Sequence, residues 1–209
     1  MEATEKKKVI VYVDGYNFYN GLKENNWKKF YWLDLVNFFQ SFISENQELV
    51  KVKYFSAIAN HEGKKKRQGI FFSANKENKK FELILGNFMD KSIECTSCQN
   101  YFNIKEEKKT DVNIATQLIA DAIQGNCELS ILVSGDSDLT PPIEFIKNYL
   151  PKHRIAVFFP PCRKGVHLKS ITHSDLSLEN YKQRFKSHQL PENIELDSGY
   201  KLIKPLKWV

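Results

Sequence analysis

The sequence predicts an α/β fold: a three-layer α/β/α sandwich around a mostly parallel, doubly wound sheet. Short apolar runs of strand length, such as residues 9–13 and 129–133, alternate with segments whose apolar residues recur at helical spacing. Both runs end abruptly at a loop that contains aspartate and glycine. Buried parallel strands end in this way at the carboxyl edge of a sheet, so we expect both loops at that edge.

The other elements follow from local patterns. Alternating or continuous apolar residues predict further strands at residues 50–59, 88–94 and 155–159. Asp34 and Thr110 are expected to cap helices, because their side chains accept hydrogen bonds from free backbone N–H groups. The expected helices cover residues 35–42, 64–80, 111–124, 141–150 and 167–186.

The length of the chain fits one domain with an appendage. Its 209 residues include 42% hydrophobic residues, which is enough for a substantial core. The alternating pattern loosens from about His167. We therefore expect one α/β domain at residues 1–165, and a helical or extended appendage at residues 166–209 that packs on it.

The charge balance is basic, with 31 Lys and Arg against 25 Asp and Glu, a net charge of +6 and a pI near 9.0. This balance favours a polyanionic partner, although ordinary solubilising charge is an equal alternative. No apolar run reaches the length of a membrane span and no secretion signal is evident, so we expect a cytoplasmic protein with no membrane partner.

Cysteine usage is consistent with reduced thiols, as expected in the cytosol. Cys95 and Cys98 have the spacing of half a zinc site, but no second Cys or His pair follows to complete four ligands. We expect plain thiols at these positions, and structural Zn²⁺ at Cys95 and Cys98 is the alternative.

Four aspartates are candidates for a metal site. Asp14 and Asp136 follow the strands at residues 9–13 and 129–133, Asp111 begins a helix, and Asp138 lies two residues beyond Asp136. Ligands bind open parallel sheets at the carboxyl ends of the strands. Carboxylates gathered there require a cation, and all-oxygen sites suit Mg²⁺ or Mn²⁺. Taken singly, each aspartate could equally be a turn former or a helix-dipole charge.

Three motifs carry a resemblance to a known family. They are Asp-Gly-Tyr-Asn-Phe-Tyr at residues 14–19, Lys-Thr-Asp-Val-Asn-Ile-Ala at 109–115, and Val-Ser-Gly-Asp-Ser-Asp-Leu at 133–139. In order and spacing they resemble the signature blocks of the NYN family (LabA-like, PIN-related), over about residues 8–160. The resemblance implies a PIN-like fold and a Mg²⁺- or Mn²⁺-dependent ribonuclease. Asp14, Asp111 and Asp136 match its metal-binding acids, and Asp138 matches a further acid.

The resemblance also suggests substrate-binding residues. Asn17 would position substrate or a metal-bound water, and Ser134 and Ser137 would bond a phosphate oxygen or orient a carboxylate. The chain departs from the family at Gln117, where related members often have another acid, and we do not expect Asp121 to replace it.

A nucleic-acid groove needs basic and aromatic side chains. Lys109 is the basic residue that we expect at a phosphate, and Tyr16 is a candidate for stacking on an unpaired base. The expected partner is single-stranded or structured RNA, preferred over DNA on the family resemblance alone. Homo-oligomerisation stays open.

Two other functions compete with a nuclease. One is a catalytically silent PIN-like module that binds RNA or protein. The other is a phosphotransferring hydrolase, which is disfavoured because no second aspartate follows two residues after Asp14.

Overall fold

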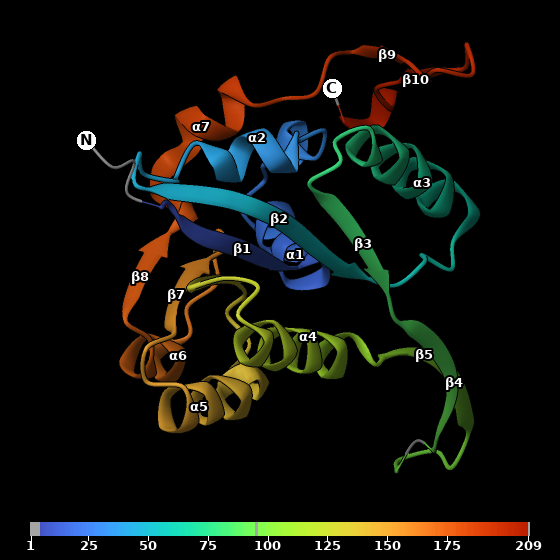
Figure 1. Ribbon diagram of the computed structural model, residues 1–209. Coiled ribbons are helices and arrows are strands. Elements are labelled where there is room, and N and C mark those ends of the chain that lie inside the picture. The colour runs from blue at the N-terminus through green and yellow to red at the C-terminus, as the bar shows by residue number, and fades with distance from the viewer. Residues whose placement is uncertain (1–4, 95, 209) are drawn as a thin grey trace.

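A computed structural model of the protein describes residues 5–94 and 96–208 (Figure 1). Its centre is a six-stranded sheet in the order β3-β2-β1-β6-β7-β8, and every neighbouring pair in it is parallel. The α/β, doubly wound prediction is therefore confirmed. The strands of this sheet are β1 (Lys7–Asp14), β2 (Gln47–Ser56), β3 (Phe81–Leu85), β6 (Leu129–Val133), β7 (Arg154–Phe159) and β8 (Ser174–Ser177).

Helices cover both faces of the sheet and make the three layers (Figure 1). Alternate residues of a strand point to opposite faces, so Val11 and Val13 belong to one core and Ile10 and Tyr12 to the other. The first core is covered by α1 (Gly15–Glu24), α2 (Leu35–Gln40), α3 (Glu62–Lys76) and α7 (Lys182–Ser187). The second is covered by α4 (Thr110–Gln124), α5 (Thr140–Tyr149) and α6 (Val166–Ile171).

The chain leaves β1 in one direction across the sheet and β6 in the other. β1 and β6 are neighbours, with Val13 opposite Val133, although more than one hundred residues separate them in the chain. The segments that follow these two strands therefore diverge, and the point between them is where open α/β sheets bind ligands.

The structure corrects the predicted elements between residues 81 and 108. The third sheet strand is β3, whereas residues 88–94 belong to β4 (Asn87–Glu94), which pairs antiparallel with β5 (Tyr101–Lys108) outside the main sheet. This ribbon projects away from the body of the molecule (Figure 1). A β-rich pattern reads the same in a hairpin as in a sheet, because both expose alternate faces.

Several helix predictions also differ from the structure. The helix expected at residues 64–80 is α3, which begins at Glu62 and ends at Lys76. Asp34 does cap a helix, accepting from the Asn37 N–H at 3.0 Å, but this helix ends at Gln40 and not at residue 42. The single helix expected over residues 167–186 is wrong. The chain there forms α6, then β8 at the edge of the main sheet, the 3₁₀ helix η3 (Leu178–Tyr181) and α7.

The last residues return to the first core. Trp32 Nε1 donates to the Pro191 carbonyl at 2.8 Å, and Leu190 N donates to the Trp32 carbonyl at 3.0 Å. Beyond them lie β9 (Asn193–Glu195), β10 (Lys201–Ile203) and the 3₁₀ helix η4 (Leu206–Trp208), which buries Trp208 against Tyr31 and Phe71. Within the described residues, no helix is both long and apolar enough to pass through a membrane.

Candidate metal centre

Asp14 occupies the junction of β1 and α1 and is 4% exposed. One carboxylate oxygen, Oδ1, accepts from the Asn17 N–H at 3.0 Å and so caps α1. The other, Oδ2, accepts from the Ser134 hydroxyl at 2.9 Å. The expected loop after β1 is thus absent, because the capping carboxylate lets the helix begin at the very next residue.

The loop after β6 is tied to the junction of β1 and α1 by two hydrogen bonds, one to the Asp14 side chain and one to the Asn17 side chain. The Ser134 hydroxyl accepts from the Asp136 N–H at 3.1 Å while donating to Asp14. The Asn17 side-chain oxygen accepts from the Gly135 N–H at 3.0 Å. Ser134 is fully buried, so of its two expected roles the geometry fits the orientation of a carboxylate.

Asp14, Asp111 and Asp136 converge, as we expected from the sequence. Each offers a carboxylate oxygen, and these three atoms all lie within 4.8 Å of one another. Asp14 is buried, Asp136 half-buried and Asp111 exposed, so the group has a protein side and a solvent side. Among the residues that the structure describes, it is the only group of three or more side chains suited to a metal ion.

The charge state of Asp14 is consistent with a cation at this place. The pKa of Asp14 is raised to about 6, chiefly by burial and also by the negative charges of Asp111 and Asp136, while the hydrogen bonds from Asn17 and Ser134 oppose the rise. A buried carboxylate beside two others is unfavourable without a compensating positive charge. Three oxygen donors around one point fit a hard divalent cation such as Mg²⁺ or Mn²⁺.

Gly15 allows β2 to approach the site closely. A Cβ atom at this position would lie 2.5 Å from Tyr54 Cε1 and 2.6 Å from the Phe55 carbonyl oxygen, both too short for any side chain. Tyr54 also donates its hydroxyl to the Gly15 carbonyl at 3.3 Å. Sequence reasoning missed Tyr54, and the glycine after Asp14 was the one signal that a neighbour packs there.

The structure does not bring every expected site residue into the cluster. Asp138 is exposed and donates its backbone N–H to Asp136 Oδ1 at 3.0 Å, and its carboxylate is not part of the group of three. Ser137 is exposed on the same turn. Tyr16 is 59% exposed at the start of α1, one residue beyond Gly15.

Lys109 precedes α4 in the left-handed conformation, with φ 79°. The expected cap at Thr110 is therefore corrected: Thr110 is the first residue of the helix, and Lys109 is the cap residue with no side-chain capping bond. Backbone in this region is strained for a non-glycine residue, and such residues cluster at functional sites. Lys109 is exposed, next but one to Asp111.

Asp121 belongs to a different buried network on α4. Lys53 Nζ donates to Asp121 Oδ2 at 2.6 Å and to Gln117 Oε1 at 2.7 Å, and the Tyr12 hydroxyl donates to Asp121 Oδ2 at 2.7 Å. Burial acts to raise the pKa of Asp121, but hydrogen bonds led by Lys53 bring it below its ordinary value. Asp121 is thus not a fourth acid of the cluster, and Gln117 serves as a partner of Lys53.

Neither Arg163 nor Cys98 is part of the acid cluster. Arg163 lies beside Gly135, but its guanidinium donates to Glu24 Oε1 at 2.6 Å. The alternative zinc site cannot be assessed as a pair, because Cys95 lies outside the described residues, and Cys98 is exposed.

The chain is similar to known proteins in sequence and in fold. A family model described as "NYN domain" matches residues 8–166. The chain is also 27% identical over 194 residues to 6-hydroxy-3-succinoylpyridine 3-monooxygenase HspA of Pseudomonas putida (strain DSM 28022 / S16). That match covers 75% of this chain but 61% of the relative, so the chain spans less than two thirds of that protein.

A solved structure, that of a protein of unknown function, VPA0982, from Vibrio parahaemolyticus RIMD 2210633, has the same fold. The TM-score is 0.56 at 19% identity, and the alignment covers 85% of this chain and 96% of that one. At this identity the likeness concerns the fold alone.

Proposed function

This chain belongs to the NYN domain family, and from this premise we propose that it is a metal-dependent endonuclease that hydrolyses RNA phosphodiester bonds. The observation that carries the proposal is the convergence of Asp14, Asp111 and Asp136, whose ligand oxygens lie within 4.8 Å of one another. The cluster lies at the reversal of strand order between β1 and β6, where α/β sheets bind their ligands.

Asp14, Asp111 and Asp136 would hold Mg²⁺ or Mn²⁺. When bound, such an ion polarises the phosphodiester and lowers the pKa of water for in-line attack. The chain's own residues fix the geometry: Ser134 and Asn17 hold both oxygens of Asp14, and the Ser134 hydroxyl also holds the loop of Asp136. Side chains that hydrogen-bond to metal ligands orient these ligands and tune their charge. In the proposed complex, the RNA approaches from the side of Asp111 and Asp136, which are less buried than Asp14.

The substrate side of the proposal depends on charge and exposure. Lys109 is exposed close to Asp111, and Tyr16 is exposed close to Asp14, so both are within the surroundings of the cluster. In the proposed complex, Lys109 contacts a phosphate and Tyr16 stacks on an unpaired base. The net charge of +6 supports association with a polyanion.

A cleavage assay tests this function. Labelled single-stranded RNA, hairpin RNA and single-stranded DNA are incubated with the protein in Mg²⁺, in Mn²⁺ and in EDTA. We expect metal-dependent RNA cleavage that falls by at least about a hundredfold in Asp14→Asn and Asp136→Asn, because each removes a charged ligand. Asp197→Asn is the control, because Asp197 is an exposed acid in the turn between β9 and β10.

The same assay separates the competing readings. Metal-loaded protein that binds RNA but cuts neither RNA nor DNA would replace the nuclease with a silent binding module. Cleavage that both aspartate variants retain would place the active site elsewhere.

The name of the Pseudomonas relative gives a second candidate, oxygenation of a small aromatic molecule. The observation that favours it is an apolar pocket of about 380 Å³ beside the acid cluster, which is large enough for such a molecule. Turnover of 6-hydroxy-3-succinoylpyridine in air with a chemical reductant, without any nuclease activity, would support this candidate against the first.

A further inference from the structure

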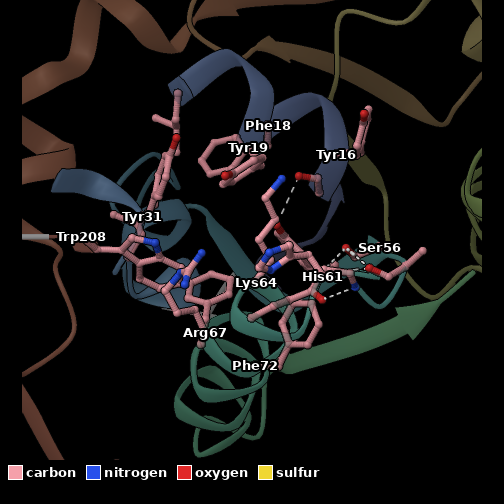
Figure 2. A pocket seen from close by; sticks show the side chains of 18 of the residues that line it. Tyr16, Phe18, Tyr19, Tyr31, Ser56, His61, Lys64, Arg67, Phe72 and Trp208 are labelled. Carbon is pink, nitrogen blue, oxygen red and sulfur yellow. Dashed lines mark hydrogen bonds between the residues drawn. The ribbon is translucent and has the colours of Figure 1, made fainter. Parts of the chain in front are cut away.

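The apolar pocket lies between α1, β2, α3 and Trp208 (Figure 2). Gly15 and Tyr16, the two residues that follow Asp14, form part of its lining. Tyr54, which also lines it, is close enough to Asp14 for that negative charge to contribute to the raised pKa of the tyrosine, after burial as the larger cause. A ligand in the pocket would therefore lie beside a metal ion held by the three aspartates.

The walls of the pocket are aromatic. The Tyr19 and Tyr31 rings lie 4.8 Å apart between centroids, and Tyr31 meets Trp208 edge-on at 5.8 Å. Trp208 in turn contacts Phe71 at 6.3 Å. Tyr19 is 38% exposed, whereas Tyr31, Phe71 and Trp208 are each less than 10% exposed, so the rings are fixed and one of them faces the entrance. Fixed aromatic rings of this kind suit a planar apolar ligand.

The other side of the pocket is cationic. Lys64 and Arg67 of α3 and His61 just before it line the cavity across from the rings of α1 (Figure 2). In the described part of the chain, neither Lys64 nor Arg67 has a carboxylate within ion-pair distance. Two cations beside an aromatic slot suit a planar ring that carries a negative group.

Gln68 gives the pocket a fixed polar edge. Its side-chain nitrogen donates to the Ala57 carbonyl at 2.9 Å and to Ser56 Oγ at 3.3 Å, and its oxygen accepts from the Ala59 N–H at 2.8 Å. These bonds hold the segment after β2 against α3. The pocket is thus formed before any ligand binds, which is typical of small-ligand sites.

We propose that this pocket holds one unstacked base of the RNA strand, with Lys64 and Arg67 at the phosphate attached to that nucleotide. The inference rests on the proposed function and deepens it, because it assigns a base preference to a single position near the cut bond. The ligand must be planar and aromatic to match the rings, anionic to match Lys64 and Arg67, and continuous with a sugar-phosphate at the acids. A nucleotide within a single strand meets all three conditions.

Trp208 makes this pocket depend on the C-terminal segment. Its backbone N–H donates to the Pro205 carbonyl at 2.8 Å, and its side chain closes one wall. The segment that follows β10 therefore has a role in substrate choice, although it lies far in sequence from the acids.

Binding in EDTA tests the pocket without any need for cleavage. The four 5′-nucleoside monophosphates and a short single-stranded RNA are titrated by calorimetry against the parent protein, Arg67→Ala and Trp208→Leu. We expect the parent to prefer one base, and both variants to bind that nucleotide about tenfold more weakly or worse. The controls are Lys66→Ala, an exposed lysine of α3 outside the pocket, and Tyr149→Leu, a tyrosine 70% exposed on α5.

Cleavage of a random-sequence RNA library gives the second readout. The parent should show a base preference at one position near the cut. Trp208→Leu, which removes one aromatic wall of the pocket, should flatten that preference while cleavage persists. Arg67→Ala, which removes a phosphate contact common to all nucleotides, should instead lower cleavage of all sequences alike. Unchanged preference and unchanged nucleotide affinity in both pocket variants would overturn the inference while the nuclease stands. If the pocket variants lose nucleotide binding but the parent cuts no RNA, the pocket is supported and the nuclease proposal is refuted. A pyridine carboxylate is titrated in the same way, and its binding in the absence of binding by any of the four nucleotides would overturn the inference.

Discussion

Replacing Asp14 with asparagine should stabilise the metal-free protein at pH 8, although it removes a residue of the proposed active site. The carboxylate is 4% exposed, and its pKa in the folded protein is about 6 against an ordinary value of 3.8. The folded chain therefore binds this proton more tightly than the unfolded chain does. The group's contribution to the free energy of unfolding is largest below about pH 4 and is lost as the pH rises to about 6.

The magnitude follows from the size of the shift. A rise of about two pKa units corresponds to about 3 kcal/mol at pH 8, at about 1.4 kcal/mol per unit. Asparagine keeps an oxygen for the Asn17 N–H but presents an amide N–H₂ group to the Ser134 hydroxyl, which reduces the gain. We expect Asp14→Asn to raise the free energy of unfolding in EDTA by about 1 to 3 kcal/mol at pH 8, and by nearly nothing at pH 4.

Urea unfolding of both proteins in EDTA, at pH 4 and at pH 8, measures this difference. Saturating Mn²⁺ should reverse its sign at pH 8, because only the parent gains stability from a bound ion. Asp138→Asn is the matched control, since this exposed acid lies on the loop after β6 but outside the cluster. If Asp14→Asn is less stable than the parent in EDTA at pH 8, or if its gain is as large at pH 4, the three carboxylates do not strain the metal-free fold.

Three further predictions concern the residues that build the site and the core. Lys53→Met should lower the free energy of unfolding by about 3 to 5 kcal/mol, because it leaves the buried carboxylate of Asp121 without its cation, and Asp121→Leu added to it should restore most of the loss. Urea midpoints measure both, and a single variant as stable as the parent would contradict the reasoning. Gly15→Ala should cost about 1 to 3 kcal/mol and reduce Mn²⁺ affinity, because its Cβ meets Tyr54 and the backbone of β2. Ser134→Ala should weaken Mn²⁺ binding by about 10- to 100-fold by calorimetry while the fold persists, and unchanged affinity would show that Asp14 needs no such support.

Local patterns were sufficient where one strand or one cap decided the structure. The strand at residues 129–133 is observed with the predicted bounds. Asp34 caps α2, because its side chain can accept a hydrogen bond from a free backbone N–H group. Local patterns failed where several conformations share one pattern. Residues 88–94 are extended as predicted but pair outside the sheet, and residues 81–85 form the edge strand that was missed. Residues 167–186 break around β8 because the edge of the sheet at β7 offers pairing that no local pattern reveals.

The sequence by itself identified the acidic residues that could hold a metal ion. Three aspartates, each next to a strand end or a helix start, were identifiable from their neighbours, because the carboxyl edge of a parallel sheet imposes that local pattern. Tertiary structure decided how those residues meet: β1 lies beside β6, so Asp14 and Asp136 come together, and α4 begins where Asp111 completes the group. It also decided the aromatic pocket, whose walls come from α1, β2, α3 and Trp208. Contacts between segments so distant in the chain depend on the packing of the whole core, which no single stretch of sequence specifies.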